Sequence, residues 1–135
     1  MTTQYLLDTN HLSDAIGKVS SLRDRIRHMR RLGHRFATCW PALLELEMGI
    51  AQTKNPEACR RILRILMKEV RLRPIDWDLL PIFGDIHIRL KRQGRVLSLV
   101  DKLLASMATR EGAVILTSDK DFEALPEIRV ENWLS

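Results

Sequence analysis

The sequence AVILTSDKD, residues 113–121, joins an unbroken apolar run to a cluster of polar and acidic residues. Ala113–Leu116 has no polar position, which is typical of a strand buried on both faces of a parallel sheet. Gly112 precedes this strand and is suited to end a helix. Asp119 and Asp121 follow it, and in sheets of this kind ligands bind beyond the carboxyl ends of the strands.

The same arrangement occurs near the start of the chain. Tyr5–Leu7 is a short apolar run that ends at Asp8, and Asp8-Thr9-Asn10 is suited to cap a helix beginning near His11. Arg35–Cys39 is a further predicted strand, and Ile128–Trp133 is a candidate terminal strand.

Helical patterns separate these strands. Val70–Ile75 is a possible short extended segment, and Pro81 is expected in the first turn of the helix that follows it, or at a bend in that helix. The predicted helices are Ser21–Leu32, Pro41–Gln52, Pro56–Glu69, one that ends at Gly94, and one from Ser98 to Arg110. Strands alternating with helices predict an α/β fold whose mostly parallel central sheet is flanked by helices.

Length and charge narrow the class of protein. The chain has 135 residues, which predicts a single domain over residues 1–135. No apolar run is long enough for a membrane helix and no signal peptide is recognisable, so we expect a cytoplasmic protein. Cys39 and Cys59 form no CxxC pair and predict no disulfide. Lys and Arg number 22 against 17 Asp and Glu, a net charge of +5 that favours a nucleic-acid partner.

Four carboxylates fall where the predicted fold brings them to one edge of the sheet. Asp8 and Asp119 follow strands, Glu45 lies early in a helix after a strand, and Asp101 lies in the first turn of another helix. Clustered carboxylates repel each other, and a divalent cation removes that repulsion. Mg²⁺ and Mn²⁺ prefer such oxygen ligands and can activate water against a phosphodiester. An acidic, metal-binding cleft on a basic chain indicates a nuclease.

Each acid also has a simpler interpretation. Asp8 can serve only as a helix cap, Glu45 as a solvated helix residue, and Asp119 as a turn residue. Asp101 can be only the capping-box partner of Ser98. For Asp121 a solvent-facing turn is the favoured role.

Five motifs in order resemble the PIN-domain family, and in particular the VapC toxins of type II toxin–antitoxin pairs. The resemblance spans almost the whole chain. The segments that carry it are Leu6–Asn10, Glu45–Gly49, Gly94-Arg95 with Asp101–Ala105, Thr117–Phe122 and Val130–Trp133.

This resemblance implies a PIN-like three-layer sandwich and an endoribonuclease that depends on Mg²⁺ or Mn²⁺. By position, Asp8 and Asp101 are the implied direct metal ligands, and Asp119 completes or supports the metal shell. Glu45 orients the attacking water or binds a second metal, and Asp121 is an alternative to Asp119. The residues implied to hold the acids by hydrogen bonds are Thr9, Asn10 and Thr117.

The resemblance also implies partners: an RNA substrate such as tRNA or rRNA, a VapB-like cognate antitoxin that covers the site, and a second copy in a homodimer. Three other functions stay open. They are a PIN-domain nuclease of RNA maturation, a PIN-like module that binds RNA without cutting it, and a phosphatase of the haloacid dehalogenase type. The phosphatase is disfavoured because Asn10 stands where that family has its second acid.

Histidines, tryptophans and basic residues offer weaker signals. His11 lies close to Asp8 and either contacts RNA or has no catalytic part, which is the favoured interpretation. The tryptophans can stack on bases, but core or sheet-edge packing is the favoured role; they are Trp40, Trp77 and Trp133. Basic residues ahead of Asp101 either contact the RNA backbone or form a solvated face; they are Arg89, Lys91, Arg92 and Arg95.

Overall fold

The computed structural model describes residues 1–134 and centres on a five-stranded sheet. All neighbouring strands pair in parallel, in the order β3-β2-β1-β4-β5. The strands are β1 (Gln4–Leu7), β2 (Arg35–Thr38), β3 (Val70–Leu72), β4 (Val114–Leu116) and β5 (Val130–Glu131). The predicted parallel sheet is confirmed, and the extended segment after residue 69 supplies one of its edge strands.

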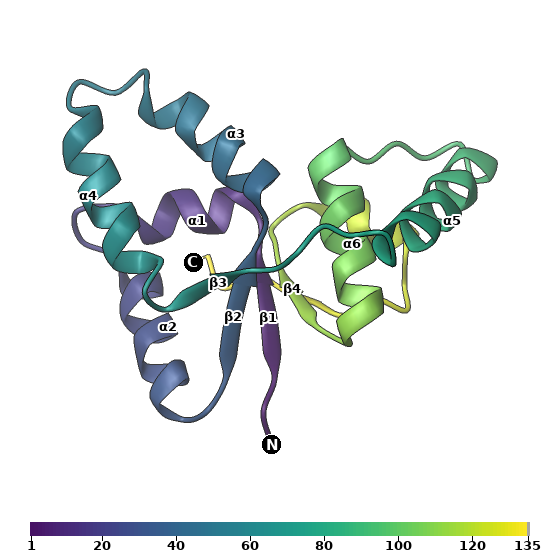
Figure 1. Cartoon of the computed structure of the whole chain (residues 1–135), viewed down its shortest axis with the longest axis horizontal. Helices are drawn as coiled ribbons and strands as arrows, with labels where there is room; N and C mark the ends of the chain where they lie inside the picture. The colour runs from purple at the N-terminus through teal and green to yellow at the C-terminus, as the bar shows by residue number, and fades with distance from the viewer. Residues whose placement is uncertain (135) are drawn as a thin grey trace.

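Six helices flank this sheet. Figure 1 shows α1 to α4 on one side of the strands and α5 and α6 on the other, which makes the sheet the middle of three layers. The helices are α1 (Thr9–Ala15), α2 (Ser21–Arg31), α3 (Trp40–Ile50), α4 (Pro56–Leu66), α5 (Leu79–Arg92) and α6 (Leu99–Glu111), and a 3₁₀ helix, η1, spans Lys120–Ala124. The predicted three-layer α/β fold is confirmed.

The helix ends follow the local signals in the sequence. The Asp8 side chain caps α1 by accepting from the His11 backbone N–H at 2.8 Å, so that helix begins two residues earlier than predicted. Ser98 caps α6 by accepting from the Asp101 N–H at 3.1 Å. Pro81 lies in the first turn of α5, where its missing N–H leaves no hydrogen bond unmade. Gly112 ends α6 in the left-handed region at φ 66°.

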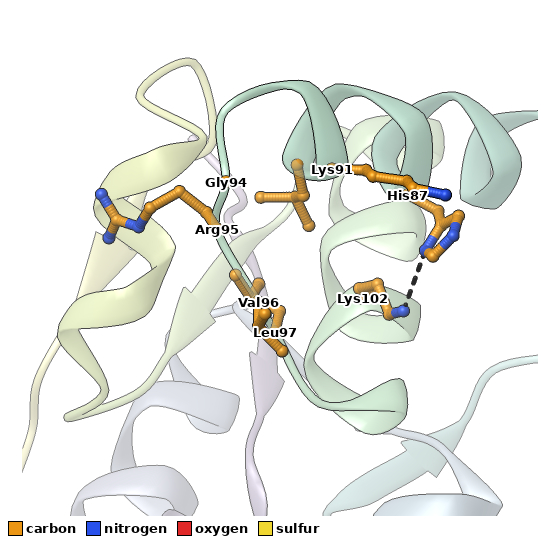
Figure 2. A pocket seen from close by; sticks show the side chains of 8 residues that line it. His87, Lys91, Gly94, Arg95, Val96, Leu97 and Lys102 are labelled. Atoms are coloured by element: carbon orange, nitrogen blue, oxygen red, sulfur yellow. Dashed lines mark hydrogen bonds between the residues drawn. The ribbon is translucent and has the colours of Figure 1, made fainter.

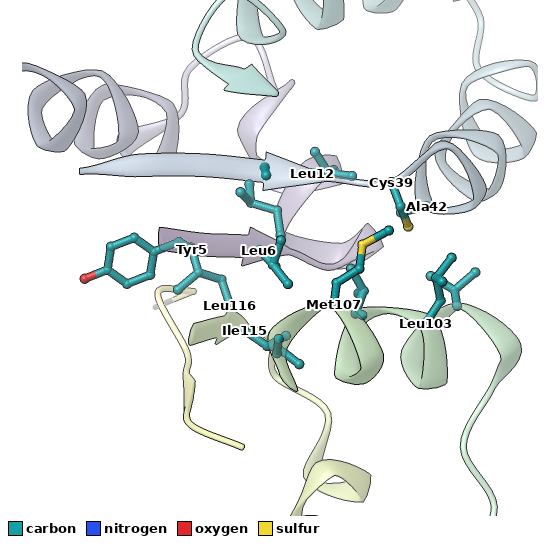
Figure 3. Close-up of a cluster of buried hydrophobic side chains, with 14 of the residues drawn as sticks. Tyr5, Leu6, Leu12, Cys39, Ala42, Leu103, Met107, Ile115 and Leu116 are labelled. Carbon is teal, nitrogen blue, oxygen red and sulfur yellow. The ribbon is translucent and has the colours of Figure 1, made fainter. Parts of the chain in front are cut away.

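The core lies on both faces of β1 and β4. Leu6 pairs with Ile115 in the register of these strands, and both side chains are fully buried. Figure 3 shows Leu12 of α1 and Met107 of α6 in the same cluster as this pair, and the two helices lie on opposite sides of the sheet (Figure 1). This packing explains the unbroken apolar runs and fixes the strand ends that carry the acids. No helix within residues 1–134 is long and apolar enough to cross a membrane.

Two of the three tryptophans depart from expectation. Trp40 and Trp77 are 60 % and 84 % exposed and lie outside the strands, so core or sheet-edge packing was the wrong prediction for both. Trp133 lies beyond β5, because the predicted terminal strand forms only over Val130–Glu131. Its ring packs against Tyr5, with ring centroids 4.9 Å apart, and lies under the guanidinium of Arg25. Trp133 therefore attaches the last described residues to the sheet.

Candidate active site

One pocket collects the four predicted acids at the carboxyl edge of the sheet. Its volume is about 410 Å³, and its acidic walls are formed by Asp8, Glu45, Asp101 and Asp119. β1 and β4 place the first and last of these, while α3 and α6 present the other two from opposite sides of the sheet. The remaining lining residues are Thr9, Asn10, Met48 and Ser98. We call this the acidic pocket.

Asp8 is the most buried of the four acids, at 5 % exposure. Burial alone raises the pKa of a carboxyl, but hydrogen bonds from His11 and Thr117 outweigh it and hold the pKa of Asp8 below its usual value. Asp8 is therefore ionised at neutral pH, although it lies almost out of contact with solvent.

His11 is the residue whose role the sequence did not reveal. Its ring is fully buried, and Nδ1 lies 3.0 Å from Asp8 Oδ1. Its Nε2 accepts the backbone N–H of Trp133 at 3.1 Å, which leaves the ring hydrogen on Nδ1 to donate to Asp8. A fully buried ring does not contact RNA. The spacing of three residues from Asp8 was the available signal, but the partner at position 133 is a long-range contact.

Asp101 has the opposite electrostatic environment. Burial, together with the charges of Asp119, Asp8 and Glu45, raises its pKa to about 6, although Ser98 partly offsets this. The other three acids therefore disfavour the ionised form of Asp101, as expected for carboxylates gathered in one pocket.

Polar neighbours hold the other two acids. Thr9 donates its hydroxyl hydrogen to Glu45 Oε1 at 2.7 Å. Thr117 Oγ1 accepts the backbone N–H of Asp119 at 3.0 Å, and Asp119 Oδ1 accepts the backbone N–H of Asp121 at 2.8 Å. Asp121 itself is exposed on η1 and is not among the residues that line the acidic pocket.

The acidic pocket has the right donors for a hard divalent cation, but not a finished coordination shell. Across residues 1–134, no three Asp, Glu, His or Cys side chains converge as they do around a metal ion. The donors are all carboxylates, which suit Mg²⁺ or Mn²⁺. The raised pKa of Asp101 is a physical sign that a cation would relieve the repulsion there.

Comparison with known proteins gives the family. The model of the PIN domain matches residues 5–128 of the chain. The chain belongs to the PIN-domain family. The match runs from the second residue of β1 past the end of η1 and includes all four acids of the acidic pocket.

This PIN-domain chain is similar to curated ribonucleases over nearly its whole length. It is 26 % identical to Ribonuclease VapC2 of Rickettsia felis, covering 96 % of this chain and 97 % of the relative. It is 28 % identical to the tRNA(fMet)-specific endonuclease VapC of Salmonella typhimurium, covering 96 % and 98 %.

Solved structures of VapBC assemblies share the fold of this PIN-domain chain. The VapBC2 complex of R. felis bound to a promoter DNA fragment contains a chain with a TM-score of 0.85 at 25 % identity, over 98 % of this chain and 100 % of that one. The DNA-bound VapBC of S. typhimurium gives a TM-score of 0.82 at 25 % identity, over 98 % and 99 %.

Proposed function

We propose that this protein is an endoribonuclease of the VapC type, the toxin of a type II toxin–antitoxin pair acting in the cytoplasm. The observation that carries the proposal is the meeting of four carboxylates in one pocket at the carboxyl edge of a PIN-domain sheet. The chain around this pocket is basic, with a net charge of +5, which suits a polyanionic substrate. The curated relatives named as VapC ribonucleases support RNA as that substrate, with tRNA or rRNA as the expected class.

The proposed cofactor is Mg²⁺ or Mn²⁺. Asp8 and Asp101 are the proposed direct ligands, and Asp119 completes or supports the shell. When bound, the ion would activate water and stabilise the charge that builds on the phosphodiester. The proposed role of Glu45, which accepts the hydroxyl hydrogen of Thr9, is to orient the attacking water or to bind a second metal. Thr117 and Asn10 support the acids, and Asp121 stays a weaker alternative to Asp119.

A VapB-like antitoxin is the proposed protein partner, and a homodimer the proposed assembly. Trp40, Leu44 and Met48 are each at least 60 % exposed and follow one another at intervals of four along α3. This spacing places them on one face of the helix, and Met48 also lines the acidic pocket. An antitoxin helix with an apolar face and a basic side chain fits such a surface. The similarity to chains of VapBC complexes supports this partner.

The test is cleavage of total bacterial RNA by the purified protein, with Asp8→Asn beside it. Asparagine still accepts the cap hydrogen bond from His11, so the variant is expected to fold. Discrete fragments from the wild type, whose ends sequencing would locate, are the expected result. Growth arrest on expression of the wild type, but not of Asp8→Asn, tests the toxin role. Intact RNA with folded, antitoxin-free protein would instead favour a module that binds RNA without cutting it.

A further inference from the structure

A second pocket adjoins the acidic pocket across the first turn of α6. Asp101 lines the acidic pocket, whereas the next residue, Lys102, lines a pocket of about 310 Å³ between α5 and α6. Consecutive residues of a helix project about 100° apart, so one turn serves both pockets. We call the second one the α5–α6 pocket.

The α5–α6 pocket has an apolar floor and a cationic rim. Leu90 and Leu97 are buried beneath it. Figure 2 shows His87, Lys91 and Lys102 gathered at one end, while the guanidinium of Arg95 points away from them. Within residues 1–134, no acidic residue lines the pocket. An anion would enter it without meeting a carboxylate.

The two lysines have no counterion of their own. Among the salt bridges within residues 1–134, none includes Lys91 or Lys102. Arg89, on the same helix, differs because it forms a bidentate pair with Glu127 at 2.6 and 2.7 Å. The positive charges of Lys91 and Lys102 are therefore not balanced by an ion pair, whereas the charge of Arg89 is balanced by Glu127.

Lys102 is held in place before any ligand arrives. It is half-buried, its Nζ lies 3.2 Å from His87 Nδ1, and the ammonium sits 5.6 Å from the ring centroid of Phe83. An ammonium group has only donors, so His87 Nδ1 accepts and Nε2 carries the ring hydrogen. A fixed cation beside a ring N–H gives two kinds of donor for phosphate oxygens, at a reduced cost in side-chain entropy.

We infer that the α5–α6 pocket binds a phosphodiester of the substrate RNA adjacent to the bond that is cut, through Lys102, Lys91 and His87. The inference rests on the proposed function, because it takes the acidic pocket as the cleavage site. RNA carries a phosphate at every nucleotide, so a strand across the acidic pocket brings a neighbouring phosphate to the other side of the α6 turn. This pocket thereby fixes the register of the strand over the acids.

The test measures RNA binding in chelator, so that it does not depend on cleavage. A short fluorescein-labelled single-stranded RNA of mixed sequence is titrated with the full chain at several salt concentrations. Lys102→Met keeps the aliphatic stem and removes the charge. Lys18→Met is the matched control, because it removes the same charge from an exposed residue that lies beyond the far end of α1.

Lys102→Met is expected to weaken binding about tenfold and to reduce the slope of log affinity against log salt by about 0.7, the contribution of one phosphate of a single strand. Lys18→Met should change neither. Equal affinity and slope for the two variants, with circular dichroism showing both folded, would overturn the inference. A loss of binding to a glutamate-rich peptide, with RNA binding unchanged, would overturn it in favour of an acidic protein segment.

Failure of the proposed function is distinguishable from failure of this inference. If the wild type cuts no RNA, the proposed function fails, while the salt slope still reports whether the pocket takes a phosphodiester. If the wild type cuts RNA, Lys102→Met should raise KM about tenfold with little change in kcat, because it removes binding common to ground and transition states. An unchanged KM would contradict the inference.

Discussion

His11 Nδ1 lies 3.0 Å from Asp8 Oδ1, and both side chains are buried. The other ring nitrogen accepts the backbone N–H of Trp133 at 3.1 Å, so one histidine joins the first acid of the acidic pocket to the last described residues of the chain. A carboxylate keeps its orientation when the ring that donates to it is itself held by a second hydrogen bond on its far side. His11 is therefore a positioning residue for Asp8.

Two substitutions of His11 should show whether this residue orients the Asp8 carboxylate or only supports folding. His11→Asn keeps a donor near Nδ1 and should retain most activity. His11→Leu removes the donor to Asp8 and should lower kcat by about 10- to 100-fold, in line with losses of outer-shell partners at metal sites. The Mn²⁺ concentration needed for half-maximal cleavage should rise in His11→Leu more than in His11→Asn. Equal kcat and equal metal requirement in the two variants would contradict this role.

Thr9 should position Glu45 as His11 positions Asp8. Its hydroxyl donates to Glu45 Oε1 at 2.7 Å, and Thr9→Val removes that hydrogen bond at nearly constant volume. We expect a loss of about tenfold in kcat and about 1 kcal/mol in the free energy of unfolding. Thr9→Ser should restore activity to within about twofold of the wild type, because the hydroxyl is what matters here. Steady-state kinetics on a defined RNA separates these outcomes.

Asp101 is expected to reduce the stability of the metal-free protein. Its pKa of about 6 in the folded state exceeds the ordinary Asp value, so the folded state binds this proton more tightly than the unfolded state does. Its contribution to stability is fully present below the ordinary Asp pKa and is lost as the pH rises through about 6.

Asp101→Asn should therefore raise Tm in chelator at pH 7.5 by a few degrees, about 1 kcal/mol after allowing for solvent screening, while abolishing cleavage. The gain in Tm should shrink below pH 6, where Asp101 is already protonated. Thermal unfolding at the two pH values checks this. A loss of Tm at pH 7.5 would show that burial of the Asp101 carboxylate and its repulsion by the other acids do not destabilise the metal-free protein.

Substitutions of Asp119 and Asp121 should have very different effects on kcat. Asp119 lines the acidic pocket, whereas Asp121 is exposed on η1. Asp119→Asn keeps the cap of η1, because asparagine accepts the Asp121 N–H equally well, yet we expect kcat to fall at least 100-fold. Asp121→Asn should stay within about twofold of the wild type. The reverse order of the two variants would make Asp121 the fourth acid.

Local patterns in the sequence were enough to predict most of the fold. Apolar runs such as Ala113–Leu116 need burial on both faces, and an all-parallel sheet meets that need. Because parallel strands share one carboxyl edge, the acids that follow β1 and β4 also met in one pocket as predicted. Caps such as Ser98 work within one helical turn, so they too could be predicted.

Contacts between distant segments could not be predicted. The link from His11 to Trp133 joins positions 122 residues apart, and nothing at either position indicates the other. Exposure of Trp40 likewise depends on which face of α3 the sheet covers. Burial raises the pKa of both Asp8 and Asp101; at Asp8 the hydrogen bonds from His11 and Thr117 outweigh it, whereas at Asp101 the charges of the neighbouring acids add to it. Tertiary arrangement decides each of these features.

Restoration of RNA cleavage by added metal is the decisive measurement of whether the acidic pocket is a metal-dependent ribonuclease centre. Purified protein is stripped with chelator, and RNA cleavage is followed after Mg²⁺, Mn²⁺ or no metal is added back, for the wild type and Asp8→Asn. We expect cleavage by the wild type only when metal is present, and none by Asp8→Asn under any condition. Cleavage that persists in chelator, or that equals the wild type in Asp8→Asn, would contradict this expectation.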